Sequence, residues 1–419
     1  MSDATRPLIL GATLAVAAIA PLHRSVHAAQ AGVAPVSDAR PSPTATFPFV
    51  YDDGRVFVPV RLGHDTTQQW FILDTGAPET TVDVGTAGRF GLATTDGGMV
   101  SGAGAHEMRS GRAGPIAVSV GGVPIAAPFI EVDPIDSLLF PYSGIHAPGV
   151  IGAQFFKEHV VELDFDARVV RVYDPAMYGY HGPGAVLPLT FTGTAPLVTG
   201  SLTLPSGTRK LMHLIADLGA KANLLVTEPF IRANGLRDAF PRHVRTVLGS
   251  GVGGETRYDF VRVPSLTFGA PPQAAVHDFV AGLSAEGTLR SDYYDGLLGA
   301  EFLSHYLLIF DYSRKQLVLA PRPVTPPPAE ADMSGIYLKR VGGDPGQVII
   351  HHVVPDSPAD RAGLHAGDVV DRVNGAASAG TSLWPWRSAL RSGDGDTVTV
   401  TIEREGDHRT TRFALHKLV

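Results

Sequence analysis

The chain has 419 residues, more than one hydrophobic core usually organises, so two or three domains are expected. Hydrophobic residues make up 44% and charged residues 18%, with 47 Gly and 33 Pro, which excludes general disorder and favours many short strands joined by turns. The formal net charge of -7 and the lack of any Lys/Arg run exclude nucleic acid as a partner.

Residues 1–29 are predicted to be a secretory signal peptide. Arg6 precedes an apolar stretch from Pro7 to Leu22, and the run VHA at 26–28 resembles a signal-peptidase cleavage site. An uncleaved membrane anchor is the alternative, although the stretch is short for a bilayer span. The absence of Cys excludes disulfides and thiol catalysis and fits an oxidising compartment. We therefore expect an exported protein, periplasmic or secreted.

Two segments rich in small residues and proline divide the rest of the chain. Residues 30–45 lack periodicity and are predicted to be a flexible linker, and the Pro-rich residues 323–331 are predicted to be a stiffer one. The intervening block is predicted to contain an N-terminal half, 46–183, and a C-terminal half, 184–322. A further domain is predicted over 332–419.

The two halves repeat the same order of parts. Segments 58–82 and 202–226 each contain an apolar strand, a turn, a returning strand and then Asp-x-Gly-Ala. A glycine-rich hairpin tip follows in each half, and the closing segments 149–175 and 296–322 match best. A period of about 145 residues is too long for a solenoid, so it indicates a duplicated domain with a pseudo-twofold axis.

The duplicated motif resembles that of a known enzyme family. The run Phe71 to Ala77 (FILDTGA) resembles the signature of retropepsin-like aspartic proteases, and Val150–Gly152 and Leu297–Gly299 resemble their downstream hydrophobic-hydrophobic-Gly motif. The resemblance covers the whole central block in both copies. It implies a mainly β, two-lobed pepsin/retropepsin-like acid protease fold, in which Asp74 and Asp217 are catalytic.

Two facing carboxyl groups explain the chemistry of such a site. Because they cannot both ionise cheaply, one keeps a proton while the other is charged. The charged one takes a proton from a water that attacks the peptide carbonyl, and the neutral one stabilises the oxyanion. Neither a metal nor a cofactor is predicted, since the 16 His show no ligand spacing.

The resemblance also assigns loops around the two aspartates. The residues expected to support the active-site loops are Thr75, Gly76, Leu218 and Gly219. The glycine-rich tips are expected to be flaps that close over an extended peptide, with Ser101, Gly102, Gly104, Ser250, Gly251 and Gly253 as their residues. A phosphate cradle is the alternative for these tips, but neither is followed by Gly-Lys-Ser/Thr.

The second motif departs from the family pattern at one position. In this family the threonine hydroxyl of each Asp-Thr-Gly bonds the backbone of the opposite lobe, but Leu218 has no hydroxyl to do so. Thr75 is still able to bond the backbone around Leu218, which permits an asymmetric but working site. A lobe pair that has lost cleavage and kept peptide binding is the alternative.

The C-terminal segment resembles a bacterial PDZ domain over about thirty residues, Gln347 to Gly375. Pro358 suits a first helical turn, Gly363 a left-handed cap, and Asn374 with Gly375 a hairpin turn. A PDZ-like β-barrel domain is therefore expected, with a helix near 383–390 and strands at 397–404 and 409–415. The residues expected to bind a peptide or its C-terminal carboxylate are Gly335, Ile336, Tyr337 and Leu338.

Together these features predict an aspartic-type endopeptidase whose PDZ domain recognises polypeptides or C-terminal peptides. The first alternative is a degenerate periplasmic peptide-binding protein, and the second is a scaffold in which only the PDZ domain matters. A monomer is expected, since one chain supplies both aspartates. A membrane is expected as a partner only if the N-terminal segment stays uncleaved.

Overall fold

The computed structural model describes residues 41–269, 274–343, 346–377 and 382–419, and all of them belong to one compact unit, Arg40–Val419. The predicted signal peptide and nearly all of the first predicted linker lie outside these residues. The described chain is mainly β, as the sequence predicts, and its strands form four sheets. No helix within the described ranges is long and apolar enough to cross a bilayer.

The first half forms a sheet of ten strands. In spatial order they are β6 (Thr95–Val100), β7 (Met108–Ala113), β10 (Ile130–Asp133), β5 (Thr81–Asp83), β11 (Gly149–Ile151), β4 (Gln69–Leu73), β3 (Arg55–Leu62), β8 (Val118–Val120) and β9 (Val123–Ile125), with β2 (Val50–Asp52) paired to β3. Strands β4 and β11 run parallel, whereas β5 and β11 run antiparallel. This arrangement places the end of β4 in the middle of the sheet.

The second half forms a sheet of eight strands in the corresponding order. They are β19 (Val244–Gly251), β20 (Gly254–Phe268), β21 (Ala274–Leu283), β18 (Leu224–Val226), β22 (Gly296–Gly299), β17 (Arg209–Asp217), β16 (Ala195–Thr203) and β15 (Thr190–Thr192). Here β17 and β22 run parallel and β18 and β22 antiparallel, as β4, β11 and β5 do. The repeat seen in the sequence therefore extends to strand order and direction.

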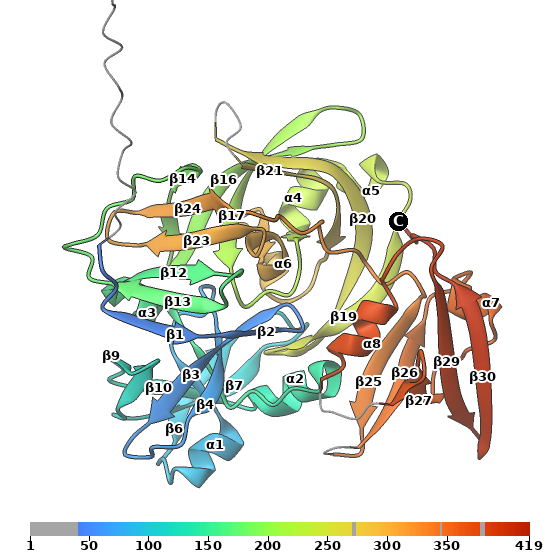
Figure 1. Ribbon diagram of the computed structural model, residues 1–419, viewed down its shortest axis with the longest axis horizontal. Coiled ribbons are helices and arrows are strands. Elements are labelled where there is room, and N and C mark those ends of the chain that lie inside the picture. Colours follow the sequence, from blue (N-terminus) through green and yellow to red (C-terminus); the bar gives the residue numbers. More distant parts are fainter. Residues whose placement is uncertain (1–40, 270–273, 344–345, 378–381) are drawn as a thin grey trace, which may run out of the picture. The chain divides into compact units, whose positions relative to one another are not determined.

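A third sheet joins the two halves. Its strands are β1 (Ala45–Pro48), β13 (Val169–Tyr173), β12 (Val160–Asp164), β23 (Tyr306–Asp311), β24 (Gln316–Pro321) and β14 (Ala185–Pro188). Strands β12 and β23 pair at its centre, where Val161 lies opposite Phe310 (Figure 1). These strands come from the two closing segments that match best in sequence. Strand β1 begins at Ala45, so the last residue of the predicted linker already lies in the sheet.

The helices are short. They are α1 (Val84–Arg89), α2 (Ile135–Ser143), α3 (Ala153–Glu158), α4 (Glu228–Ala233), α5 (Leu236–Ala239), the 3-10 helix η1 (Gly287–Arg290), α6 (Ala300–Leu303), α7 (Pro358–Arg361) and α8 (Trp384–Ala389). Gly152 precedes α3 and Gly299 precedes α6, and a Cβ at either position would collide with backbone carbonyl oxygens of the loop that follows the nearby aspartate. The hydrophobic-hydrophobic-Gly motif is thus explained by close backbone packing.

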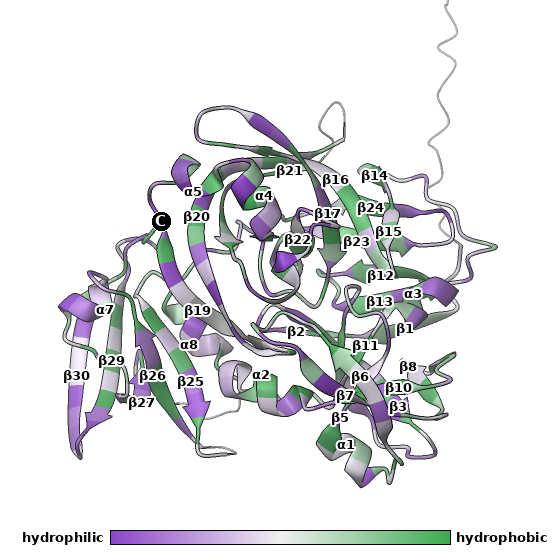
Figure 2. Cartoon of the chain, turned by 180° about the vertical axis from the view of Figure 1, so that it is seen from behind, coloured by the Kyte–Doolittle hydropathy of each residue, from purple (hydrophilic) through white to green (hydrophobic). Residues whose placement is uncertain are grey.

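The C-terminal segment forms a fourth sheet with a core of its own. Its strands are β25 (Ile336–Val341), β26 (Gln347–Val353), β27 (Val369–Val373), β29 (Thr397–Arg404) and β30 (Asp407–Ala414), with β28 (Ala376–Ala377) paired to β27. Strand β25 lies at one edge, next to α2, and β30 at the other edge consists largely of hydrophilic residues (Figures 1 and 2). Buried side chains of β25, β26, β27 and β29 and Trp386 of α8 fill the core.

Candidate active site

The structure brings Asp74 and Asp217 together. Asp74 directly follows β4, and Asp217 is the last residue of the equivalent strand β17. Both line one cavity of about 530 Å³, which we call the dyad cavity. A Cβ on Gly76 would lie 2.8 Å from Asp217 Oδ1, and one on Gly219 would collide with the carboxylate of Asp74. Each aspartate is therefore packed against the glycine of the opposite loop, which only glycine permits.

Backbone amides fix the orientation of both carboxyl groups. The N–H groups of Gly76 and Ala77 donate to Asp74 Oδ1 at 2.7 and 3.1 Å, and the N–H of Gly219 donates to Asp217 Oδ1 at 2.9 Å. These bonds stabilise the charged form of each group.

The two carboxyl groups share a hydrogen bond and titrate as a pair. Burial raises the pKa of Asp74, and the bond from Asp217 and the backbone amides lower it only in part. Burial raises the pKa of Asp217 well above 3.8, and the charge and hydrogen bond of Asp74 raise it further. The pair therefore keeps one proton under conditions in which two ordinary aspartates would be ionised.

Thr75 ties the two loops together across the halves. Its fully buried hydroxyl donates to the carbonyl oxygen of Ala216 at 2.6 Å and accepts the N–H of Leu218 at 2.9 Å. Leu218 is also fully buried but makes no return bond with its side chain. Thr75 of the first half therefore bonds the loop of the second half, but Leu218 gives no equivalent bond to the loop of the first half.

Replacing Thr75 by Val is expected to destabilise the protein by about 1–3 kcal/mol. Valine keeps the shape but leaves the buried N–H of Leu218 and the carbonyl of Ala216 without partners. Urea unfolding measures the change, with Thr75→Ser as the control because it keeps the hydroxyl. If Thr75→Val unfolds at the same urea concentration as the wild type, the tie does not hold the halves together.

The two predicted flaps meet each other. In the tip between β6 and β7, the N–H of Gly104 donates to the carbonyl oxygen of Val252 at 2.8 Å. The N–H of His106 donates to the carbonyl oxygen of Gly253 at 3.1 Å. A Cβ on Gly102 would collide with the side chain of Val252, so the crossing of the tips requires glycine there. Five of the predicted flap residues take part in this crossing or line the cavity; they are Ser101, Gly102, Gly104, Gly251 and Gly253. Ser250 lies in β19, and its side chain is outside the described residues.

The base of the second flap is bound by the C-terminal domain. Glu255, directly after that flap tip, accepts hydrogen bonds from Tyr142 of α2 and, at 3.0 Å, from Lys339 Nζ of β25. His351 Nε2 lies 3.4 Å from the same carboxylate. Burial raises the pKa of Glu255, but these neighbours outweigh it and lower the pKa. The carboxylate of Glu255 therefore attaches the flap to both α2 and β25.

A buried ion cluster beside the dyad was missed in the sequence. Asp53 is 1% exposed and accepts Lys221 Nζ, Arg387 Nη1 at 3.0 Å and Arg55 Nη1 at 3.3 Å. Arg55 and Lys221 also line the dyad cavity, and Arg387 belongs to α8. No local pattern links these residues, because they are distant in sequence. Within the described ranges, no three His, Asp or Glu side chains group as metal ligands would.

The loop before β25 has a distinct geometry. The carboxylate oxygen Oδ1 of Asp332 accepts the N–H groups of Ser334, Gly335 and Ile336 at 2.9, 2.6 and 3.2 Å. Gly335 has φ +86°, and a Cβ there would collide with the side chain of Ser357, which caps α7. The loop is thus folded around a carboxylate supplied by the chain itself.

Comparison with known proteins identifies this C-terminal region. Residues 312–415 match the family described as PDZ domain. The chain carries a C-terminal PDZ domain. The match starts before the domain's own sheet, because residues 312–321 include β24 of the sheet that joins the halves.

One solved structure with a partial similarity is described as "photosystem II D1 C-terminal processing protease". It is 29% identical to the chain over the matched part, with a TM-score of 0.20. The match covers 20% of this chain and 23% of that one, so the chain spans less than a quarter of that protein's length.

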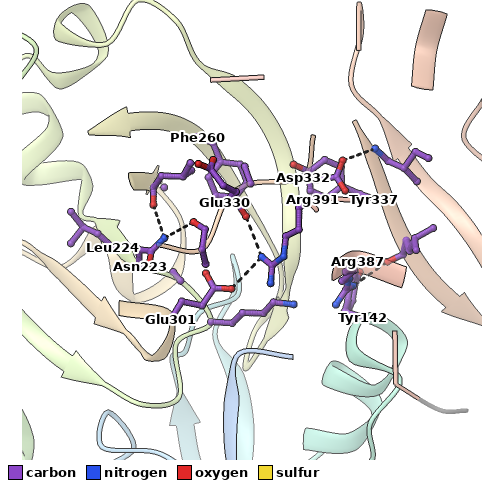
Figure 3. Close-up of a pocket in the computed structure, with 18 of the residues that line it drawn as sticks. Tyr142, Asn223, Leu224, Phe260, Glu301, Glu330, Asp332, Tyr337, Arg387 and Arg391 are labelled. Carbon is purple, nitrogen blue, oxygen red and sulfur yellow. Dashed lines mark hydrogen bonds and ion pairs between the residues drawn. The ribbon is translucent and has the colours of Figure 1, made fainter. Parts of the chain in front are cut away.

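The PDZ domain presents its edge strand to a second cavity. Residues Ile336, Tyr337 and Leu338 of β25 line a space of about 90 Å³ together with side chains of the second half (Figure 3). Arg391, just after α8, donates to Glu301 at 3.4 Å and to the carbonyl of Glu330 at 3.2 Å. Asn223 of the second half donates to the carbonyl of Ala329 at 2.9 Å, so the end of the predicted Pro-rich linker is bound from both sides.

Of the predicted PDZ residues, Gly335 and Ile336 already donate their N–H groups to Asp332. Burial raises the pKa of Asp332 to about 6, although these bonds lower it. The carboxylate of a bound peptide would have to compete with this internal carboxylate for the same N–H groups. The sequence could have indicated this competition, because an Asp side chain often accepts the N–H two residues later, and Asp332 lies two residues before Ser334.

Peptides with a free C-terminal carboxylate are expected to bind the wild-type PDZ domain no more tightly than their C-terminal amides. Replacing Asp332 by Ala releases the loop N–H groups, and the free acid should then bind about tenfold more tightly than the amide. Calorimetric titration of the paired peptides measures both affinities. A wild-type protein that already prefers the free acid tenfold contradicts this role of Asp332.

Proposed function

We propose that the protein is an aspartic-type endopeptidase with a two-lobed pepsin/retropepsin-like fold. The observation that carries the proposal is the pair Asp74 and Asp217, which are equivalent in the repeat, share a hydrogen bond and face one cavity. The equivalent strand orders of the two halves and the sheet that joins them support the same conclusion. Because one chain supplies both carboxyl groups, the proposed site is complete in a monomer.

In the proposed mechanism, one water lies between the two carboxyl groups. The ionised member takes a proton from this water as the oxygen attacks the peptide carbonyl. The protonated member donates to the developing oxyanion and later supplies the proton that the leaving amine needs. The flaps, which close the cavity by their mutual bonds, would open to admit an extended peptide and hold it by backbone hydrogen bonds.

The second candidate is a peptide-binding protein that does not cleave. Leu218 favours it, because the tie between the loops lacks its return bond. A PDZ domain is itself a peptide-binding module, which adds a segment as a strand beside its edge. In the first proposal the PDZ domain brings polypeptides or their C-termini to the dyad. In the second, the PDZ domain and the dyad cavity both bind peptides, but no peptide is cleaved.

Export remains part of the proposal. The signal-peptide pattern over residues 1–29 and the absence of Cys support a periplasmic or secreted protein whose partners are polypeptides. Nucleic acid is not proposed as a partner, because the sequence carries no basic run.

The test is digestion of a diverse peptide pool by the purified protein from acid to neutral pH, followed by mass spectrometry. New peptide termini that depend on both aspartates support the endopeptidase. Measurable binding of the pool without any new termini favours the second candidate.

A further inference from the structure

The two sides of the dyad cavity differ in chemistry although the strands that form them are equivalent. In the first half, Thr81 pairs with Val150 and lies beside Glu131. In the second half, the corresponding positions are Leu225, which pairs with Leu297, and Gly282. A polar pair on one side thus corresponds to an apolar residue and a glycine on the other.

Two carboxylates from β10 line the first side. Glu131 and Asp133 are two residues apart in one strand, so their side chains lie on the same face, and both border the cavity. Asp133 is only 2% exposed, and its Oδ1 has no hydrogen-bond partner among the described residues. A buried carboxylate oxygen without a donor is costly, which indicates that a donor from outside the chain belongs there.

The neighbouring groups do not neutralise this pair. Arg112 lies opposite Glu131 in the sheet, but its guanidinium stacks on the ring of Phe129 at 3.3 Å, and neither it nor the hydroxyl of Thr81 lowers the pKa of Glu131 enough to offset burial. Burial, Asp133 and Glu79 raise the pKa of Glu131. Ser110 lowers the pKa of Asp133, but burial raises it more. The first side therefore carries two carboxylates in need of a cation.

The second side is apolar and aromatic. The residues that line it are Ile215, Leu225, Tyr258, Leu289, Tyr294 and Leu297. The hydroxyl of Tyr294 donates to the carbonyl of Thr288 at 2.6 Å, so its ring faces the cavity without an unpaired polar group. Such a surface suits a large apolar side chain.

We propose that the dyad cavity selects peptides with Lys or Arg on one side of the cleaved bond and a large apolar or aromatic residue on the other. Glu131 and Asp133 bind the cationic side chain, with Oδ1 of Asp133 accepting one of its N–H groups. The inference rests on the proposed endopeptidase function and names its substrate class.

Matched peptides test the proposal. One series carries Lys on one side of the cleaved bond and Leu on the other, and its counterpart carries norleucine in place of Lys, which has a similar length but no charge. The wild type should cleave the Lys peptide with a kcat/KM about 10- to 100-fold higher, as expected for hydrogen bonds to charged groups. Glu131→Gln with Asp133→Asn should abolish this preference by lowering kcat/KM for the Lys peptide to that of the norleucine peptide.

Asp238→Asn is the matched control, because it removes one carboxylate from an exposed helical position away from the cavity. It should keep the full preference for Lys. Circular dichroism of the double variant verifies that it folds. If it does not, each single amide variant is measured, and each should lose part of the preference.

A binding measurement separates this inference from the proposed function. Asp217→Asn protein is titrated with the labelled Lys and norleucine peptides, so no turnover is needed. Tighter binding of the Lys peptide that disappears with Glu131→Gln supports the subsite even if the protein cleaves nothing. Equal affinities overturn the subsite, whether or not the wild type is a peptidase.

Discussion

Replacing Asp74 or Asp217 by Asn is expected to lower peptide turnover at least about 10³-fold. In the proposed mechanism one carboxyl group takes a proton from water and the other supplies a proton to the leaving amine. An amide can do neither. The loss should appear in kcat, with little change in peptide affinity, because an amide has nearly the size of the carboxyl group it replaces. Single-turnover digestion of a fluorescent peptide measures kcat, and anisotropy measures binding.

The pH profile of the wild type gives an independent readout of the same pair. Activity needs one proton on the dyad, so it falls when both groups are protonated and when both are ionised. Because burial raises both pKa values, and that of Asp217 well above 3.8, the active range should extend to higher pH than two ordinary aspartates would allow. Full turnover by either variant, or a profile that does not depend on Asp217, contradicts the proposed mechanism.

The duplication was predictable because its signals are local. A strand that ends in Asp-x-Gly-Ala, a glycine-rich tip and a closing Gly are short patterns, and finding them twice fixes the order of the strands around each aspartate. The helix and the strands expected in the C-terminal domain lie close to α8, β29 and β30 for the same reason. Hydrophobic periodicity and turn residues specify such elements without knowledge of their neighbours.

The contacts between these parts were not predictable. Glu255 is an ordinary residue after a hairpin tip until the fold places Lys339 and Tyr142 beside it. The unpartnered oxygen of Asp133 depends on which strands surround β10, since a carboxylate at the end of a strand is usually exposed. Sequence gives the type of such groups but not their desolvation, and desolvation is what makes them functional candidates.

The cluster around Asp53 connects the two parts of the molecule that the sequence separated. Asp53 lies 168 residues from Lys221 and 334 residues from Arg387. Lys221 follows the loop of Asp217, and Arg387 belongs to α8 of the PDZ domain. Burial lowers the pKa of Lys221 to about 7; Asp53 opposes this, and the charges of Arg387, Arg55 and Arg391 add to it. One carboxylate thus holds three cations that would otherwise repel each other.

Replacing Asp53 by Asn is expected to destabilise the protein by about 3–5 kcal/mol, because it leaves buried cations without their partner. Asp53 has φ +47°, a conformation that Asn tolerates well, so the change reports on charge rather than backbone strain. Asp278→Asn is the matched control: its φ is also +47°, but its side chain is 66% exposed and pairs with Arg262 at 3.3 Å. This exposed pair should contribute less than about 1 kcal/mol.

The pH dependence of the difference distinguishes lost charge from lost packing. Burial acts to raise the pKa of Asp53, but the three cations outweigh burial and lower this pKa from 3.8 to about 2. A carboxyl pKa lowered by folding stabilises the native state above the unfolded value and loses that contribution as pH falls through the folded value. The gap in unfolding free energy between wild type and Asp53→Asn should therefore shrink by roughly 2 kcal/mol between about pH 4 and pH 2. A gap that stays the same across that range shows that Asp53 acts through packing alone, and the PDZ helix is then not attached to the active-site loop by charge.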